Sequence, residues 1–234
     1  MKRKITLSLV ILLSFLAGFL YFENTKLQQT ITETENEIEE QKTKLEMKEM
    51  EEYFATNSEA TDVTLSYETW VESTKLAEQL LEDSGGKFEK EWGIFLGEIA
   101  AQRDIDPFIV YELLRTETGG SFDPTLVGPE TRFGHAYGMA QFMKNTAPWI
   151  AEMAGLPYND DLLFDPLYSI QLSVEYLNYL YNKYEDWDYA LTAYHRGVGG
   201  LENYIDANGH AKSAYAIEIQ ENAEEIGDLI AYSN

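Results

Sequence analysis

The sequence predicts an all-α protein in which a long N-terminal helix precedes a helical domain. Apolar residues recur at helical spacing along most of the 234 residues, and no segment shows the alternation of apolar and polar residues that is typical of a strand. Asp-Pro and Ala-Pro pairs, which are typical of helix starts, alternate with glycines, which are typical of helix ends. These three observations favour helices throughout the chain.

Residues 1–22 have the pattern of a membrane anchor. Three basic residues at positions 2–4 precede an uncharged run, residues 5–22, which as a helix would be about 27 Å long and would match a hydrocarbon core roughly 30 Å thick. The basic flank predicts that residues 1–4 stay in the cytoplasm and that everything after the anchor lies outside, on a single-pass chain in the cell membrane. A cleaved signal peptide is the alternative, but its apolar region is usually shorter and the sequence after Ala17-Gly18 is a poor cleavage site.

Residues 23–61 form a predicted helical spacer. The segment contains no glycine, proline or tryptophan and is rich in Glu, Lys, Gln and Thr. Apolar residues recur every seven positions at Ile31, Ile38 and Leu45. The positions between them are mostly polar: Leu27, Thr34, Gln41 and Lys48. This pattern predicts a solvated helix or weak coiled coil, roughly 45 Å long, and favours spacing over a weak homodimer.

Composition excludes several kinds of site and partner. Cysteine is absent, which excludes disulfides, thiolate metal sites and the lipid attachment of a bacterial lipoprotein. The three histidines, His135, His195 and His210, have no metal-ligand spacing, so we expect no metal and no cofactor. The formal net charge of −24 predicts repulsion from nucleic acid, and solubility is its simplest explanation.

Residues 62–234 form the predicted domain. Its expected helices span residues 65–81, 88–101, 107–118, 146–154, 165–181, 189–194, 201–205 and 211–230. Gly85-Gly86 closes the first of these helices, and Gly155 closes the fourth. Asp106-Pro107 and Asp165-Pro166 place an N-cap residue before a proline at the first helical position, so they open the third and the fifth.

The third predicted helix carries the first candidate for chemistry. Val110, Leu113 and Leu114 form a stripe that should face the core, and Glu117 is the next member of that stripe. Burial and the negative end of the helix dipole both disfavour an ionised acid in the last turn. Both effects would raise the pKa of Glu117 toward the value that a general acid needs at neutral pH. The alternative is a frayed, hydrated helix end, and the helix alone does not decide between the two.

Three motifs follow in order from Glu117. They read Glu-Thr-Gly-Gly-Ser at 117–121, Tyr-Gly-Met-Ala-Gln-Phe-Met at 137–143 and Ala-Leu-Thr-Ala-Tyr-His-Arg-Gly-Val-Gly at 190–199. In order and spacing they resemble the soluble lytic transglycosylase catalytic domain of the lysozyme-like superfamily, with its Glu-Ser, Gly-Leu-Met-Gln-x-Met and Ala-Tyr-Asn-x-Gly. The resemblance covers about 98 to 204, and it extends more loosely to the C-terminus. Each motif alone is weak, but three in this order are specific.

The resemblance implies a lysozyme-like helical domain with a glycan-binding groove, facing the cell wall. The implied partner is the peptidoglycan strand, cut between N-acetylmuramic acid and N-acetylglucosamine. Glu117 matches the family's single catalytic acid/base, and the 6-hydroxyl of the muramic acid would close a 1,6-anhydro ring without a second carboxylate. Tyr194 matches the tyrosine whose hydroxyl bonds that acid; its alternative is a core aromatic.

The resemblance also implies a set of substrate-binding residues. They are Thr118, Tyr137, Gly138, Gln141, Met143 and His195. Gly138 would let the backbone approach the sugar, or would simply serve a turn. Gln141 would bond sugar groups, or would cap a loop. Met143 would line the groove, or would pack in the core.

The chain departs from the family pattern at several positions. Thr118 replaces the usual Ser, His195 the usual Asn, and Gly128 stands where the family often has Ser. Two other functions therefore stay open. A muramidase would cut the same bond with water, positioned by Asp123 or by Glu130 from the long loop 130–137. An inactive scaffold of an envelope-spanning complex would need no chemistry at all.

Overall fold

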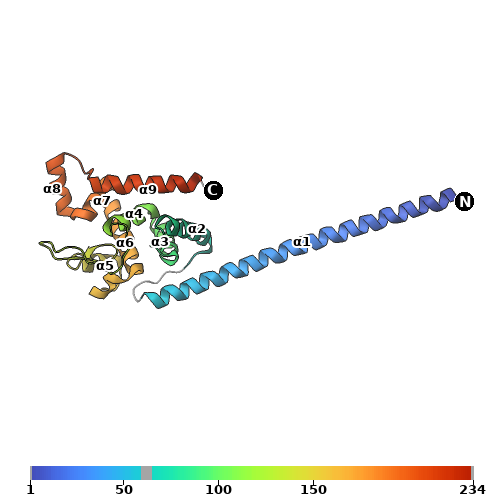
Figure 1. The fold of residues 1–234 in the computed structure, drawn as a ribbon, viewed down its shortest axis with the longest axis horizontal. Coiled ribbons are helices and arrows are strands. Elements are labelled where there is room, and N and C mark those ends of the chain that lie inside the picture. Colours follow the sequence, from blue (N-terminus) through green and yellow to red (C-terminus); the bar gives the residue numbers. More distant parts are fainter. Residues whose placement is uncertain (1, 59–64, 233–234) are drawn as a thin grey trace. The chain divides into compact units, whose positions relative to one another are not determined.

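The computed structural model describes the backbone of residues 2–58 and 65–232, and the side chains of 16–58 and 65–229. It divides into two units, residues 1–49 and residues 50–234. The first unit belongs to one continuous helix, α1 (Lys2–Asn57), which Figure 1 shows at full length. The predicted helical spacer, residues 23–61, is therefore helical as far as residue 57, and its residues 59–61 lie outside the described part of the chain.

The part of α1 between residues 16 and 48 is almost entirely exposed. The apolar positions of the seven-residue repeat, Leu27, Ile31, Ile38 and Leu45, are 46–62% exposed. Pairs one turn apart support the helix, as in the hydrogen bond of 2.9 Å from Gln29 to Glu33. The homodimer through this segment stays a prediction.

The predicted anchor, residues 5–22, lies mostly outside the residues whose side chains the structure describes. Within the described part of the chain, no helix carries an apolar stretch long enough to cross a membrane. The end of α1, from Met50 onward, belongs to the second unit. Phe54 is buried there and packs edge-on against Phe95, with ring centroids 5.2 Å apart. The second unit thus begins earlier than the predicted boundary at residue 62.

Among its described residues, the second unit contains the helices that the sequence predicts, together with two short strands. Its elements are α2 (Tyr67–Asp83), α3 (Lys90–Arg103), α4 (Pro107–Glu117), β1 (Ala136–Tyr137), β2 (Phe142–Met143), α5 (Ala147–Ala154), the 3-10 helix η1 (Asp160–Phe164), α6 (Pro166–Tyr184), α7 (Trp187–Arg196), α8 (Val198–Asn208) and α9 (Ala214–Tyr232). Each expected helix is present, within a few residues at most ends. The strands β1 and β2 were not predicted, because two residues are too few for an alternating pattern.

The helix starts follow the capping chemistry read from the sequence. The Asp106 carboxylate accepts a hydrogen bond of 2.9 Å from the Phe108 backbone N–H at the start of α4. Asp165 does the same for α6 at 2.9 Å, through the second residue of the helix. Asp186, which was not predicted as a cap, does so for α7 at 2.8 Å. These caps satisfy donors that a helix start leaves unpaired, so they fix where α4, α6 and α7 begin.

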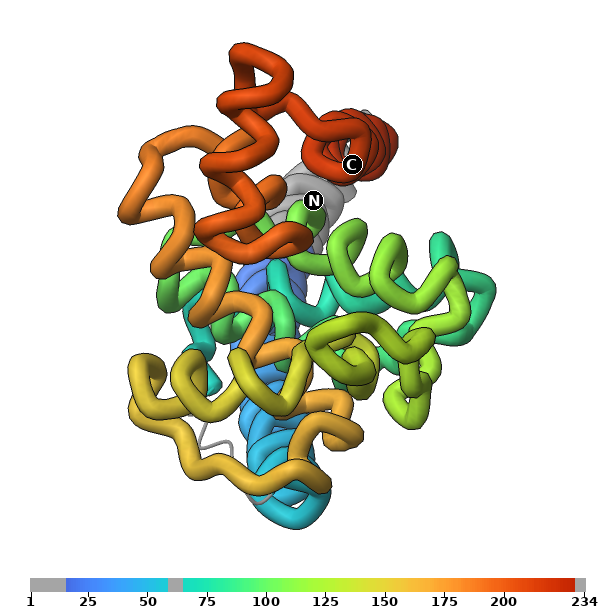
Figure 2. Tube along the Cα trace, turned by 90° about the vertical axis from the view of Figure 1, so that its left-hand side faces the viewer, coloured from blue at the N-terminus to red at the C-terminus, as the bar shows by residue number. Residues whose placement is uncertain are grey.

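The core of the second unit forms around α6. This helix packs against α3, α5 and α7, and α4 packs against α9. Tyr168, Ile170, Leu172 and Leu177 of α6 are fully buried. Figure 2 shows α8 and α9, in orange-red to red, at the top of the view. The packing of α9 on α4 brings the last helix to the end of the helix that carries Glu117.

Candidate active site

Glu117 is the last residue of α4 and is partly buried. Val110, Leu113 and Leu114, the other members of its stripe, are completely buried. The stripe therefore faces the core, as the sequence predicts, and it delivers the carboxylate to an apolar environment. The hydrated helix end that was the alternative is not what the structure contains.

A tyrosine hydroxyl holds the Glu117 carboxylate. The Tyr215 Oη donates a hydrogen bond of 2.6 Å to Glu117 Oε1. Burial raises the pKa of Glu117 to about 7, although the Tyr215 hydrogen bond acts in the opposite direction. Near pH 7 the carboxyl group is therefore shared between its protonated and ionised forms, which is what a group that gives and then takes a proton requires.

Tyr215 lies in the first turn of α9, and its backbone is fixed by buried hydrogen bonds. Thr192 Oγ1 of α7 lies 2.6 Å from the Ala211 carbonyl and 2.7 Å from Ser213 Oγ, just before α9 begins. Two turns further along α9, Asn222 donates to the buried Glu112 of α4 at 3.2 Å. Helix α9 is thereby tied to both α7 and α4 around the acid.

Sequence reasoning missed Tyr215. It is one of 16 tyrosines and lies 98 positions after Glu117, and no local pattern distinguishes it. The prediction that Tyr194 bonds the acid is wrong. The Tyr194 hydroxyl donates instead to the Ala140 carbonyl at 3.1 Å and lies 3.3 Å from Ser173 Oγ. Burial, and to a smaller extent the neighbouring Glu117 carboxylate, hold the pKa of Tyr194 well above its usual value.

Tyr194 therefore lies beside the acid but connects α7 to the turn between β1 and β2. That turn contains Gly138 and Gln141. Gly138 has a φ of +73°, and a Cβ there would lie 1.7 Å from the Leu163 carbonyl oxygen. The close approach to Leu163 requires glycine here, and the expected approach of a sugar to this backbone stays a prediction.

Gln141 and Thr118 use their polar groups within their own loops. Gln141 Nε2 donates to the Gly138 carbonyl at 2.8 Å, which is a loop-capping bond, and the binding of sugar groups by Gln141 stays a prediction. Its Oε1 occupies the space beside Gly128, where a Cβ would approach to 2.5 Å. The buried Thr118 hydroxyl donates to Leu114 at 2.8 Å and accepts from the Phe122 N–H at 3.0 Å. Thr118 thus caps the end of α4 and the loop that follows it, and its role in substrate binding stays a prediction.

The remaining predicted residues lie on the strands and at the end of α7. Tyr137 of β1 and Met143 of β2 are partly exposed, and the strands pair antiparallel with Tyr137 opposite Phe142. The Lys144 ammonium lies 4.5 Å above the Tyr137 ring. His195 stacks on Tyr215, with ring centroids 4.5 Å apart and 16° between the ring planes. The binding roles of Tyr137, Met143 and His195 stay predictions.

The two acids considered for a hydrolase lie in exposed loops. Asp123 Oδ1 accepts from the Thr125 N–H at 2.8 Å and from its hydroxyl at 2.7 Å, and these bonds hold the pKa of Asp123 below its usual value. Glu130 is exposed at the start of the long loop. Burial raises the pKa of Glu117 and the Tyr215 hydrogen bond lowers it, and no second carboxylate among the described residues contributes.

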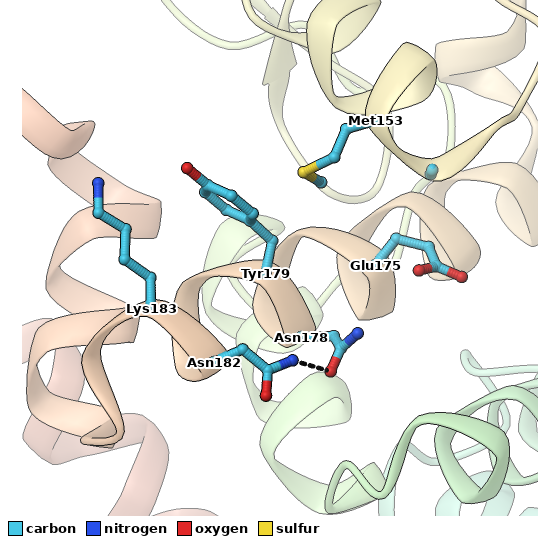
Figure 3. A pocket seen from close by; sticks show the side chains of 7 residues that line it. Met153, Glu175, Asn178, Tyr179, Asn182 and Lys183 are labelled. Carbon is cyan, nitrogen blue, oxygen red and sulfur yellow. Dashed lines mark hydrogen bonds between the residues drawn. The ribbon is translucent and has the colours of Figure 1, made fainter.

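A cavity of about 420 Å³ lies elsewhere, between α5 and α6. Figure 3 shows its lining: Met153, Glu175, Asn178, Tyr179, Asn182 and Lys183, with Asn182 bonded to Asn178. None of the residues that line it belongs to the three motifs or contacts Glu117, so this cavity is separate from the candidate site.

Replacing Tyr215 by Phe is expected to raise the pKa of Glu117. The change removes the hydrogen bond that favours the carboxylate and keeps the ring. The alkaline limb of the pH–rate profile should shift upward, and the rate should fall roughly tenfold because the acid loses its orientation. Tyr194→Phe is the matched control, since it removes a hydroxyl beside Glu117 without touching this bond. An equal pH shift in both variants would contradict the assignment.

Glu117→Gln is expected to stabilise the fold at alkaline pH. The pKa of Glu117 is about 7 in the folded chain against an ordinary value of 4.5, so the folded state keeps a proton that the unfolded chain has lost. The wild-type free energy of unfolding should therefore fall as pH rises from 4.5 through 7. Urea unfolding should show almost no difference between variant and wild type at pH 4, and a variant more stable by roughly 3 kcal/mol at pH 8. An advantage that is the same at both pH values would contradict the raised pKa.

Part of the chain matches a known protein family. The family model described as Transglycosylase SLT domain matches residues 95–217, a range that includes Glu117, Tyr194 and Tyr215. No curated protein matches the chain.

Two solved structures are similar over part of their length. The first is an inactive mutant of the lytic transglycosylase Slt from Pseudomonas aeruginosa, 19% identical, with a TM-score of 0.43, covering 64% of this chain and 27% of that one. The second is the 70 kDa soluble lytic transglycosylase from Escherichia coli, 18% identical, with a TM-score of 0.43, covering 69% and 29%. The chain thus spans less than a third of either protein.

Proposed function

Because this chain belongs to the Transglycosylase SLT domain family, we propose that it is an enzyme that cleaves peptidoglycan as a lytic transglycosylase. The observation that carries the proposal is Glu117, partly buried at a helix end, with a pKa of about 7 and a tyrosine hydroxyl on its carboxylate. The bond to be cleaved joins N-acetylmuramic acid to N-acetylglucosamine.

One carboxyl group performs both proton transfers in this mechanism. Protonated Glu117 gives its proton to the glycosidic oxygen as the bond from that oxygen to the anomeric carbon of the muramic acid breaks. The Glu117 carboxylate then takes the proton of the muramic acid 6-hydroxyl as this oxygen bonds to the same anomeric carbon. The products are a free 4-hydroxyl on N-acetylglucosamine and a 1,6-anhydromuramic acid end. Glu117 ends protonated, and no water is consumed.

The lone carboxyl group favours this route over the muramidase route. A hydrolase of the two-carboxylate kind needs a second acid near the first, as a nucleophile or to activate water. No second carboxylate among the described residues contributes to the pKa of Glu117, and Asp123 is engaged by Thr125. An inactive scaffold is disfavoured for a different reason. Burying the Glu117 carboxyl group lowers the stability of the fold, and groups buried at such a cost are typical of active sites.

Mass spectrometry of muropeptides released from purified sacculi tests the proposal. We expect 1,6-anhydromuramic acid ends. A muramidase would release reducing ends that are heavier by one water molecule, and an inactive scaffold would release nothing. Either of these results would replace the proposed function.

We further propose that residues 5–22 hold the protein in the cell membrane with the catalytic unit outside, facing the wall. The support is the basic flank at 2–4 followed by the uncharged run. Full-length protein should sediment with membranes and resist alkaline washing, whereas a chain lacking residues 1–22 should not. Recovery of the full-length protein in the soluble fraction would overturn this localisation.

A further inference from the structure

The imidazole of His195 covers one face of the Tyr215 ring. The ring centroids are 4.5 Å apart and the planes differ by 16°, so the two rings lie flat on each other. His195 is in the last turn of α7, directly after Tyr194, and Tyr215 is in the first turn of α9. The contact therefore joins two helices at the point where the phenol reaches Glu117.

The hydrogen bond to Glu117 depends on where this phenol points. The Oη of Tyr215 is at the far end of a side chain that rotates about two torsions, so a small rotation moves the hydroxyl out of its 2.6 Å contact. Thr192 and Ser213 fix the backbone just before Tyr215, but they do not hold the ring. The flat contact with His195 restricts the rotation that remains.

The stack is one of two uncharged rings near neutral pH. Burial, and to a smaller extent the adjacent Arg196, lower the pKa of His195. The guanidinium of Arg196 itself lies 4.8 Å over the Tyr204 ring. From the other packed elements, the Tyr215 phenol of α9 faces the His195 ring, and the Glu117 carboxylate of α4 accepts the hydrogen bond of that phenol. Packing, and not a cation over the phenol, is therefore the interaction that His195 supplies.

We propose that His195 is a positioning residue for the reaction: its ring holds the Tyr215 phenol flat, so that the Tyr215 hydroxyl stays on Glu117. The inference rests on the proposed function. The family pattern has Asn where this chain has His195, and Asn has no ring that could cover the phenol. This way of positioning the tyrosine would therefore be limited to chains with an aromatic side chain at this position. His195 then acts through Tyr215 and not on the sugar.

The test compares His195→Ala with His195→Phe in the full-length chain, each with and without Tyr215→Phe. Phe keeps a flat ring and removes both ring nitrogens, so it is the matched control. The first readout is the pKa of the Glu117 carboxyl group, followed by carboxyl-¹³C NMR titration and assigned by the signal that Glu117→Gln removes. The second is the pH profile of muropeptide release. Thermal unfolding verifies that each variant is folded.

His195→Ala should raise the pKa of Glu117, in the same direction as Tyr215→Phe, and should lower kcat roughly threefold to tenfold with KM unchanged. His195→Phe should behave as wild type. In the Tyr215→Phe background, His195→Ala should change nothing further, because the hydrogen bond is already gone.

Three results would overturn the proposal. They are an unchanged Glu117 pKa in His195→Ala, an effect of equal size in the Tyr215→Phe background, and a loss in His195→Phe as large as in His195→Ala. A rise in KM alone would mean that His195 contacts substrate instead. The NMR titration needs no substrate, so it decides on His195 even if the sacculi release nothing and the proposed function fails.

Discussion

Glu117→Gln is expected to reduce muropeptide release by about three orders of magnitude while the chain stays folded. Gln has the size of Glu and its amide oxygen accepts the Tyr215 hydrogen bond, so the geometry of the site is kept. It cannot give a proton to the glycosidic oxygen, and removing such a group typically costs a factor of about 10²–10⁴. The measurement is the initial rate of release from purified sacculi near pH 7.

Glu130→Gln is the control for this experiment. Glu130 is an exposed acid in the long loop, and the transglycosylase mechanism gives it no role. The rate of this variant should equal that of wild type. If Glu130→Gln loses as much activity as Glu117→Gln, a second carboxylate takes part in the reaction, and the result favours the muramidase mechanism. Undiminished release by Glu117→Gln would remove Glu117 from the mechanism altogether.

Gly138→Ala is expected to destabilise the catalytic unit by about 3 kcal/mol or more. The added Cβ would lie 1.7 Å from the Leu163 carbonyl oxygen, and the φ of +73° is itself unfavourable for alanine. Backbone must therefore move, and the turn between β1 and β2 moves with it. Urea unfolding measures the loss, and activity should fall as well because this turn accepts the Tyr194 hydrogen bond.

Gly120→Ala separates the effect of the positive φ from the effect of the contact with Leu163. Gly120 has a φ of +75°, nearly that of Gly138, but a Cβ there meets no atom within 4 Å. Only the backbone strain remains, which costs roughly 1–2 kcal/mol. If the two alanine variants lose the same free energy of unfolding, the contact with Leu163 does not explain why glycine is needed at 138.

The helices were predictable because their signals are local. Asp106 and Asp165 mark their helix starts within two residues, and Gly155 closes α5 in the left-handed conformation that favours glycine. The strands β1 and β2 were not predictable. Their pairing depends on a turn whose geometry is set by the distant Leu163, and no periodicity within two residues reports that contact.

The candidate site was predictable only in part, for the same reason. Glu117 follows from an apolar stripe within its own helix, and its raised pKa follows from burial. The hydrogen-bond partner of Glu117 could not be predicted in this way, because Tyr215 lies 98 positions away in the sequence and meets Glu117 only through the packing of α9 on α4. Tyr194 was the wrong partner although it lies beside the acid. The direction in which a side chain points depends on tertiary packing, and it cannot be predicted from the order of the motifs along the sequence.

The distance of 98 positions between acid and partner also sets an order of events in time. A chain emerging from the ribosome presents Glu117 long before Tyr215, and early segments fold first. Until α9 closes against α4 and α7, the acid stands without the hydroxyl that orients it. The hydrogen-bonded site at Glu117 is thus complete only after the chain has been synthesised at least as far as Tyr215.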